Sequence, residues 1–218
     1  MNLEDIVRLQ SFPEHTKMAP QNARYGLVLV DIQQGFDHPT HWGKSRSTPE
    51  FESNIAKLLD AFRSAVEPAS IFHVCHHSTL PDSPLHPVNG NAAFQPYATP
   101  HSGESTFAKS VNSAFIGTSL EAAVRERSIT DLVIVGLTTD HCVSTTVRMA
   151  ANLGVVSGAA ESSDGRILLV KDATATYEKS FAGKTYDAET VHSVHLTSLN
   201  GEFCEVVTTE DVLRELRM

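Results

Sequence analysis

The stretch DLVIVGLTTDHCVSTTVRMAANLG, residues 131–154, decides the fold that the sequence predicts. Its first six residues form a short apolar run, typical of strands that are buried on both faces of a sheet. The residues from Cys142 to Leu153 then predict a helix, and Gly154 is a typical helix stop. A buried strand that leads into a helix is the repeating unit of a parallel sheet with helical crossovers.

The same unit recurs along the rest of the chain. Further buried strands are predicted at residues 25–31, 70–75, 166–172 and 203–208. This alternation predicts an α/β protein with a three-layer αβα, Rossmann-like fold and a mostly parallel sheet of five to six strands. The long stretch 76–117 holds five prolines, so we expect loops there, and loops of this length tend to be functional.

Several residues mark the expected helix ends. Thr48 is predicted as the N-cap of a helix whose first residue is Pro49. Thr118 and Glu121 have the spacing of a capping box for the next helix. Asp187 is predicted to cap a later helix, and the last ten residues predict a final one.

We expect one domain over residues 25–218. Residues 1–24 are expected to hold a short N-terminal helix, over residues 2–10, and a polar lead-in. The segment 157–166 is small, polar and Gly-containing, which predicts a surface insertion between a helix and a strand.

Composition limits the classes of partner. The net charge is −9 and no run of Lys or Arg offsets it, so we expect no nucleic-acid partner. No apolar run approaches the roughly 20 residues that span a bilayer, so we expect no membrane span. Three widely spaced cysteines fit a reducing compartment, and the N-terminus lacks the basic and apolar regions of a signal peptide. We therefore expect a cytoplasmic protein that acts on a small molecule.

Ligands of open parallel sheets gather at the carboxyl ends of the strands. The residues that follow the predicted strands are Asp31, His76, His77, the segment 138–142 and Asp172. These residues are therefore the first candidates for a functional site.

Cys142 invites two interpretations. At a helix start, unpaired backbone N–H groups and the helix dipole would lower the pKa of its thiol and make it a nucleophile. Alternatively, it is a small apolar residue that fills the contact between helix and sheet. Asp31 could act as a general base or cap a loop. Lys109 could lie on the surface, or hold an aspartate and a thiolate in their charged forms.

Three segments, LVLVDIQQGF (27–36), KSVNSAFIGTSL (109–120) and LVIVGLTTDHCVSTTVRMAANLG (132–154), resemble the signature segments of the isochorismatase-like cysteine hydrolase superfamily. The similarity extends over about residues 25–217. Members of that superfamily include nicotinamidases, N-carbamoylsarcosine amidases, ureidoacrylate and biuret hydrolases, and isochorismatases. The resemblance implies a catalytic triad of Asp31, Lys109 and Cys142.

The resemblance also implies how the triad works. In the family the aspartate accepts the thiol proton, the cysteine attacks an amide carbonyl, and water hydrolyses the resulting thioester. The family has a non-proline cis peptide before the cysteine, which here would join Leu137 to Thr138. The backbone N–H groups of Thr138 and Cys142 would then form an oxyanion hole.

Six residues are expected to contact the substrate: Gln33, Phe36, Trp42, His76, Phe115 and His141. The resemblance implies that Gln33 orients Asp31. The aromatic residues, together with Tyr177, are expected to form a wall of the pocket, although each on its own is more often part of a core.

We expect no metal and no cofactor. Eleven histidines invite a metal hypothesis, above all in FDHPTHWG (36–43) and HVCHH (73–77). The first segment lacks the spacing of the metal site of nicotinamidases, and no carboxylate lies beside the second in the sequence.

The sequence therefore predicts a cysteine hydrolase that cleaves the C–N bond of a small amide or ureido compound. Two alternatives remain: a vinyl ether hydrolase of the isochorismatase type, and a binding relative without activity. Isochorismatases of the superfamily use no cysteine nucleophile, and a binding relative would be expected to have lost a triad residue. The resemblance also implies a homo-oligomer, either a dimer or a tetramer.

Overall fold

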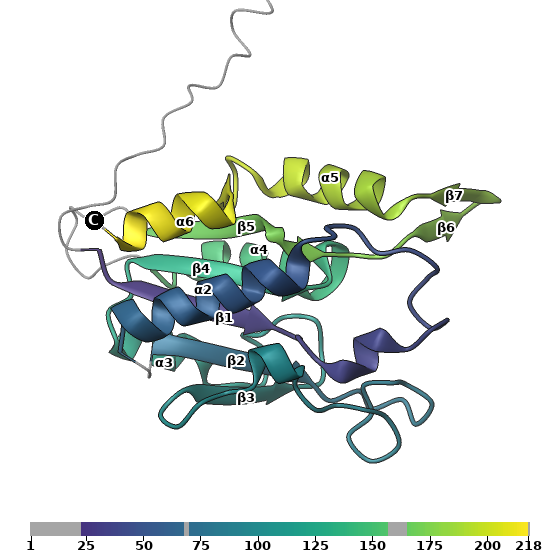
Figure 1. The fold of residues 1–218 in the computed structure, drawn as a ribbon, viewed down its shortest axis with the longest axis horizontal. Coiled ribbons are helices and arrows are strands. Elements are labelled where there is room, and N and C mark those ends of the chain that lie inside the picture. Colours follow the sequence, from purple (N-terminus) through teal and green to yellow (C-terminus); the bar gives the residue numbers. More distant parts are fainter. Residues whose placement is uncertain (1–22, 68–69, 157–164, 218) are drawn as a thin grey trace, which may run out of the picture.

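The computed structural model describes residues 23–67, 70–156 and 165–217 (Figure 1). The helix predicted over residues 2–10 lies outside these ranges, as does most of the predicted insertion at 157–166.

The centre of the molecule is a six-stranded sheet in which every neighbouring pair of strands is parallel. Its strands, in spatial order, are β3 (Ser105–Lys109), β2 (Ile71–His76), β1 (Tyr25–Val30), β4 (Asp131–Leu137), β5 (Arg166–Ala175) and β8 (Glu205–Val207). This sheet confirms the predicted fold class and its upper strand number.

Helices cover both faces of this sheet. One face packs against α2 (Phe51–Ala65) and α6 (Thr209–Leu216), and the other against α3 (Leu120–Glu126), α4 (Ser144–Leu153) and α5 (Ala188–Leu199). Figure 1 shows α2 and α6 together on the near face. None of the helices within the described ranges is long and apolar enough to cross a bilayer.

Strand β1 shows why two cores form. Its residues alternate between the two faces, so that Leu27 and Leu29 belong to the cluster under α2, and Val28 and Val30 to the cluster under α3 and α4. All six residues of the strand are buried. A strand with apolar side chains on both faces is stable only between two layers of helices, which gives the three-layer fold.

Two strand regions were missed by the sequence analysis. Strand β3 lies inside the Pro-rich stretch that was expected to be loop, and β6 (Lys179–Phe181) and β7 (Lys184–Tyr186) form a small hairpin. This hairpin extends beyond the main sheet in Figure 1. Strand β3 is short, lies at the edge and alternates between exposed and part-buried residues, so it lacks the apolar run that reveals the central strands.

Three helix starts differ from the expectation. Thr48 is not an N-cap: it has φ +58°, its hydroxyl donates to the Thr174 carbonyl, and α2 begins only at Phe51. The Thr118 hydroxyl accepts from the N–H of Leu120, two residues on, rather than closing a capping box.

The third difference concerns Cys142. A π-helical turn, η4 (Thr139–Val143), separates β4 from α4, and α4 begins at Ser144 rather than at the cysteine. Other expectations are confirmed: Gly154 ends α4 with φ +57°, and the Asp187 carboxylate caps α5 by accepting the Thr190 N–H at 2.8 Å.

Gly136 lets β4 approach β1 closely near their carboxyl ends. It has φ +120°, and a Cβ atom there would lie 2.0 Å from the carbonyl oxygen of Val30. Only glycine fits such a position. The close approach brings the residues that follow the two strands to one place at the edge of the sheet.

A buried ion cluster ties the segment before β3 to α2. The Glu104 side chain is 1% exposed and accepts hydrogen bonds from the Arg63 guanidinium, from the His73 ring and from the His101 backbone N–H. Burial disfavours the charged carboxylate, but these hydrogen bonds outweigh burial and lower the pKa of Glu104 to about 2.

We expect Glu104→Gln to lower the free energy of unfolding at pH 7 by about 3 kcal/mol, because the charged carboxylate satisfies all of these donors. The pKa of Glu104 is lower in the folded state, so its stabilisation is present above the ordinary glutamate pKa and is lost as the pH falls towards 2. Urea unfolding at a series of pH values measures this difference.

The matched control is Glu121→Gln, which removes an exposed ion pair with Arg125. It should change the free energy of unfolding by less than about 0.5 kcal/mol. A difference between Glu104→Gln and the parent that stays constant down to pH 3 would contradict the proposed role of the charge.

Candidate active site

The candidate site lies where the order of the strands reverses. The strand order is β3-β2-β1-β4-β5-β8. Strands β2 and β3 are added in sequence on one side of β1, and strands β4, β5 and β8 are added on the other side. Ligands of open α/β sheets bind outside the carboxyl ends of the strands at this point. Asp31 follows β1 directly, and the segment from Thr138 to Cys142 follows β4.

The ammonium group of Lys109 brings the three predicted catalytic residues together. Its Nζ lies 2.6 Å from Asp31 Oδ2 and 3.3 Å from Cys142 Sγ. Lys109 is 3% exposed and ends β3, so it belongs neither to a loop nor to the solvated surface. His76, at the end of β2, places its Nδ1 3.2 Å from the same ammonium.

The backbone around Asp31 turns its carboxylate inward. Asp31 has φ +53°, a conformation that aspartate adopts more readily than most residues, and its N–H donates to the Val74 carbonyl at 2.8 Å. The residue is fully buried. Oδ2 accepts from Lys109, whereas Oδ1 has no hydrogen-bond partner among the described residues. This oxygen is therefore available to accept a proton.

Cys142 is held by the π-helical turn that follows β4. The peptide bond between Leu137 and Thr138 is cis, as the resemblance implied. The Thr138 carbonyl accepts hydrogen bonds from the N–H groups of His141 and Val143, which fold the turn around the cysteine. Ligand atoms of Asp31, His76 and Cys142 all lie within 4.8 Å of one another.

The pKa of the Cys142 thiol is raised, contrary to the expectation of a helix-activated thiolate. Burial is the largest cause, and the nearby charge of Asp31 adds to it, while Lys109 acts in the opposite direction. Cys142 is 9% exposed and precedes the first turn of α4, and desolvation of the thiolate is the dominant effect on its pKa. The resting group is a thiol, and its reaction requires a base.

Two neighbours of the thiol have shifted pKa values as well. Burial raises the pKa of Asp31, although the charge and hydrogen bond of Lys109 oppose the shift. Burial and the charge of Lys109 lower the pKa of His76. At neutral pH, His76 is therefore uncharged beside the ammonium.

The same cluster contains residue types that can bind a metal. Asp31, His76 and Cys142 form the one group of three or more potential ligands found within the described residues. Lys109 Nζ lies within hydrogen-bonding distance of all three residues, so a positive charge already occupies the position that a cation would take. The donor set therefore does not fit a metal ion while Lys109 is present.

The first-loop residues that had suggested a metal are used otherwise. The carboxylate of Asp37 accepts from the Gln95 amide at 2.8 Å. Nδ1 of His38 accepts from the backbone N–H groups of Thr40 and His41. These contacts stabilise turns in the loop.

A cavity of about 550 Å³ opens above the thiol. Of the residues predicted to contact the substrate or the oxyanion, six line it: Phe36, Trp42, His76, Thr138, His141 and Cys142. Part of the aromatic wall is present, since Phe36 and Trp42 line the cavity with their rings 4.5 Å apart. Tyr177 stacks on Phe36 with a centroid distance of 6.3 Å but does not itself line the cavity.

Gln33 and Phe115, by contrast, do not line this cavity, which corrects their predicted role. The Gln33 side chain is fully buried, donates to the carbonyls of His76 and Ala92, and accepts the N–H of His76. It therefore ties strand ends together. Phe115 packs in the core under α3 and α4. Its aromatic side chain gave no signal that distinguishes a core position from a pocket wall.

Several residues of the cavity were not predicted from the sequence. They are His41, Ser78, Leu80, Pro81, Asp82, Ser83, Leu85, Asn112 and Lys179. Most of them lie in the Pro-rich stretch after β2, whose length was the available signal. Lys179 comes from the hairpin of β6 and β7, which no pattern in the sequence had indicated.

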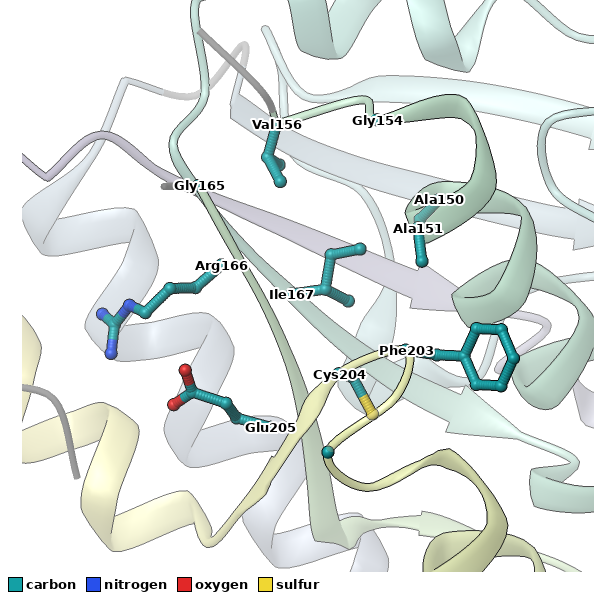
Figure 2. A pocket seen from close by; sticks show the side chains of 11 residues that line it. Ala150, Ala151, Gly154, Val156, Gly165, Arg166, Ile167, Phe203, Cys204 and Glu205 are labelled. Atoms are coloured by element: carbon teal, nitrogen blue, oxygen red, sulfur yellow. The ribbon is translucent and has the colours of Figure 1, made fainter. Parts of the chain in front are cut away.

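Two further cavities lack this chemistry. One, of about 780 Å³, lies between residues 34–38 and 81–91, and its lining holds neither a cysteine nor a lysine. The other, of about 290 Å³, lies at the amino ends of β5 and β8 (Figure 2). The thiol of Cys204 lies there, at the amino ends of the strands, whereas Cys142 lies beyond their carboxyl ends.

Cys204 is a useful comparison. Its pKa is also raised, to about 12, by burial and by Glu205. Its sulfur contacts the Leu199 carbonyl at 3.7 Å. In Figure 2 the charged ends of Arg166 and Glu205 extend away from the sulfur, and Arg166 forms ion pairs with Asp131 and Glu215. No carboxylate among the described residues hydrogen-bonds this sulfur, and a buried thiol without a base in contact with it is chemically inert.

Comparisons with known proteins agree with the fold. Residues 25–211 match the model of the isochorismatase domain. The uncharacterized isochorismatase family protein YrdC of Bacillus subtilis is 37% identical over 190 residues, which cover 87% of this chain and 94% of that protein.

Solved structures give the same result. A protein of the isochorismatase family from Chromobacterium violaceum has a TM-score of 0.80 and 36% identity, and the match covers 92% of this chain and 97% of that one. A cysteine hydrolase from Pseudomonas syringae pv. phaseolicola shares the fold, with a TM-score of 0.74, 24% identity, and coverage of 89% and 92%. The chain therefore belongs to the isochorismatase family of hydrolases.

Proposed function

We propose that the protein is a cysteine hydrolase that cleaves the C–N bond of a small amide or ureido compound through a thioester on Cys142. One observation carries this proposal: a buried ammonium lies within hydrogen-bonding distance of both a carboxylate and a thiol, and the residue that carries the thiol lines a cavity. A carboxylate, a thiol and a fixed cation are the parts that nucleophilic attack on a carbonyl requires.

The first half of the reaction is the acylation of Cys142. Asp31 takes the thiol proton through its unpartnered Oδ1, and the sulfur attacks the carbonyl carbon of the substrate. Lys109 is in contact with both groups, so it stabilises the negative charge before and after the proton moves. When the C–N bond breaks, the leaving nitrogen takes the proton from Asp31 and departs as ammonia or an amine.

The second half is hydrolysis of the thioester. Asp31, again deprotonated, takes a proton from a water molecule that attacks the acyl carbon. The C–S bond then breaks, the sulfur recovers its proton from Asp31, and the acid product leaves. The enzyme returns to its starting form without a cofactor.

The carbonyl oxygen becomes negative during both steps. Thr138 and Cys142 both border the cavity, and their backbone N–H groups are the proposed oxyanion hole. Loss of one such donor typically costs a factor of about 100 to 1,000 in kcat.

The cavity suggests the size and shape of the substrate. About 550 Å³ suits a small molecule, and Phe36 and Trp42 offer flat apolar surfaces beside the thiol. His141 and Lys179 add polar groups to its lining. This combination supports a compact substrate with one apolar side and one polar end.

Other proposals follow from the sequence. Its three cysteines are all free, which supports the cytoplasm as the compartment, and we further propose a homodimer or homotetramer without a nucleic-acid partner. Vinyl ether hydrolysis is less well supported, because isochorismatases use no cysteine nucleophile. A non-catalytic role would leave the cluster of Asp31, Lys109 and Cys142 unexplained.

We expect Cys142→Ala to abolish the release of ammonia from the best substrate of a screen over small amides and ureas. The loss should be at least about a thousandfold in kcat, since the nucleophile is gone. Mass spectrometry of the parent protein, quenched during turnover, should detect the acyl group on the peptide that contains Cys142.

Cys204→Ala is the matched control, because it removes an equally buried thiol at the opposite edge of the sheet. It should keep kcat within about twofold of the parent. Activity that survives in Cys142→Ala, with isochorismate included in the screen, would favour the vinyl ether reaction instead.

The pH dependence provides a separate test. Asp31 must be deprotonated to act as the base, and its pKa is raised, so kcat/KM should fall on the acid side at a pH above the ordinary aspartate range of about 4. The fall should persist in His76→Asn, which removes the imidazole beside Lys109. If the acid-side fall in kcat/KM stays near pH 4 in both proteins, Asp31 does not act as a buried base.

A further inference from the structure

The ammonium group of Lys109 has three acceptors for its three N–H bonds. Asp31 Oδ2 lies at 2.6 Å, His76 Nδ1 at 3.2 Å and Cys142 Sγ at 3.3 Å. Asp31 and Cys142 have roles in the proposed reaction, whereas no role in it has yet been given to the contact with His76.

The chemistry of this contact fixes the form of the histidine. An ammonium group can only donate, so Nδ1 of His76 must accept, and the proton of the neutral ring must lie on Nε2. The backbone of Val111 also hydrogen-bonds the ring. The charged and titratable neighbours of the ring are Lys109, Asp31 and His77, and burial together with the charge of Lys109 disfavours protonation of the ring.

The position of His76 is fixed by two strands and by Gln33. His76 and Lys109 are direct partners in the parallel pair of β2 and β3. The Gln33 amide oxygen accepts the His76 N–H at 2.7 Å, and its amide nitrogen donates to the His76 carbonyl at 3.2 Å. Both backbone polar groups of His76 are thus held from the end of β1, which leaves the ring little freedom to move.

We propose that His76 is a positioning residue, which holds the Lys109 ammonium between Asp31 and Cys142 while negative charge moves from the carboxylate to the sulfur. This inference rests on the proposed function, since it takes Cys142 as the nucleophile. It also gives Gln33 a role, because Gln33 hydrogen-bonds the backbone of His76, and the His76 ring contacts the Lys109 ammonium.

The physical reason lies in the path of the charge. Before proton transfer the ammonium faces the Asp31 carboxylate, and afterwards it must stabilise the sulfur. With His76 as the third acceptor, the ammonium is already placed for both states and needs no reorientation during the reaction. Without that acceptor, one buried N–H is unsatisfied and the group turns to find another partner.

The test compares four variants with the parent. His76→Asn keeps a short side-chain acceptor near the position of Nδ1, and His76→Gln moves that acceptor one carbon further away. His76→Leu keeps the approximate volume without any acceptor. His77→Leu is the control, because the His77 ring contacts Cys75 rather than Lys109.

The first measurement is the rate at which iodoacetamide alkylates Cys142 at neutral pH, followed by mass spectrometry of the peptide. In this reaction the sulfur bonds to the reagent's carbon, iodide leaves, and the thiol proton passes to Asp31. We expect at least about a tenfold slower reaction in His76→Leu and His76→Gln. His76→Asn and His77→Leu should stay within about threefold of the parent.

The second measurement is the nitrogen-15 NMR signal of the Lys109 ammonium, assigned by its absence in Lys109→Met. Three hydrogen bonds slow the exchange of its protons with water, so the signal should be visible in the parent and in His76→Asn. It should broaden or vanish in His76→Leu and His76→Gln. A role in overall stability alone would not produce this pattern.

Equal alkylation rates in His76→Leu and the parent would overturn the proposal. It would also be overturned if Cys142 in His76→Asn were alkylated as slowly as in His76→Gln. If His76→Leu fails to fold, the Asn and Gln pair still decides, because both keep a polar amide. Neither measurement needs a substrate. A protein that gives the expected rates and signals but hydrolyses no amide or urea would therefore contradict the proposed function and leave the role of His76 standing.

Discussion

The structure depends on one buried positive charge, the ammonium group of Lys109. A charge that is removed from water must have partners that satisfy it, because desolvation otherwise costs several kcal/mol. Its three acceptors come from the ends of β1 and β2 and from the turn after β4, while the lysine itself ends β3. Four strands must therefore end together, and the parallel sheet brings them to the same edge.

The reactivity proposed for Cys142 depends on these partners rather than on a helix. Cys142 and Cys204 are equally buried, and both have a raised thiol pKa. Only Cys142 has a carboxylate and an ammonium beside it. A protonated thiol with an adjacent base fits the proposed reaction, in which the nucleophile is generated only when a carbonyl is in place.

The catalytic groups and the walls of the cavity have different origins. The proposed catalytic groups lie at the ends of strands and in the turn after β4, and the hydrogen bonds of Gln33 hold His76 beside them. Most of the walls belong to loops, namely the segment after β1 and the Pro-rich stretch after β2, with Lys179 from the hairpin. Relatives can therefore keep the same chemistry and change the substrate by changing these loops.

The sequence by itself determined the three-layer fold, because the central strands are apolar on both faces and alternate with helices. It also determined the catalytic candidates, since Asp31 and Cys142 follow such strands and the motif around Lys109 resembles a known segment. Only the tertiary structure decided that Lys109 ends an edge strand, that His76 is the third acceptor, and that Gln33 and Phe115 do not line the cavity. It also decided that the thiol is protonated at rest, because burial depends on every element that packs around the sulfur, whereas the local pattern shows only the helix that follows it.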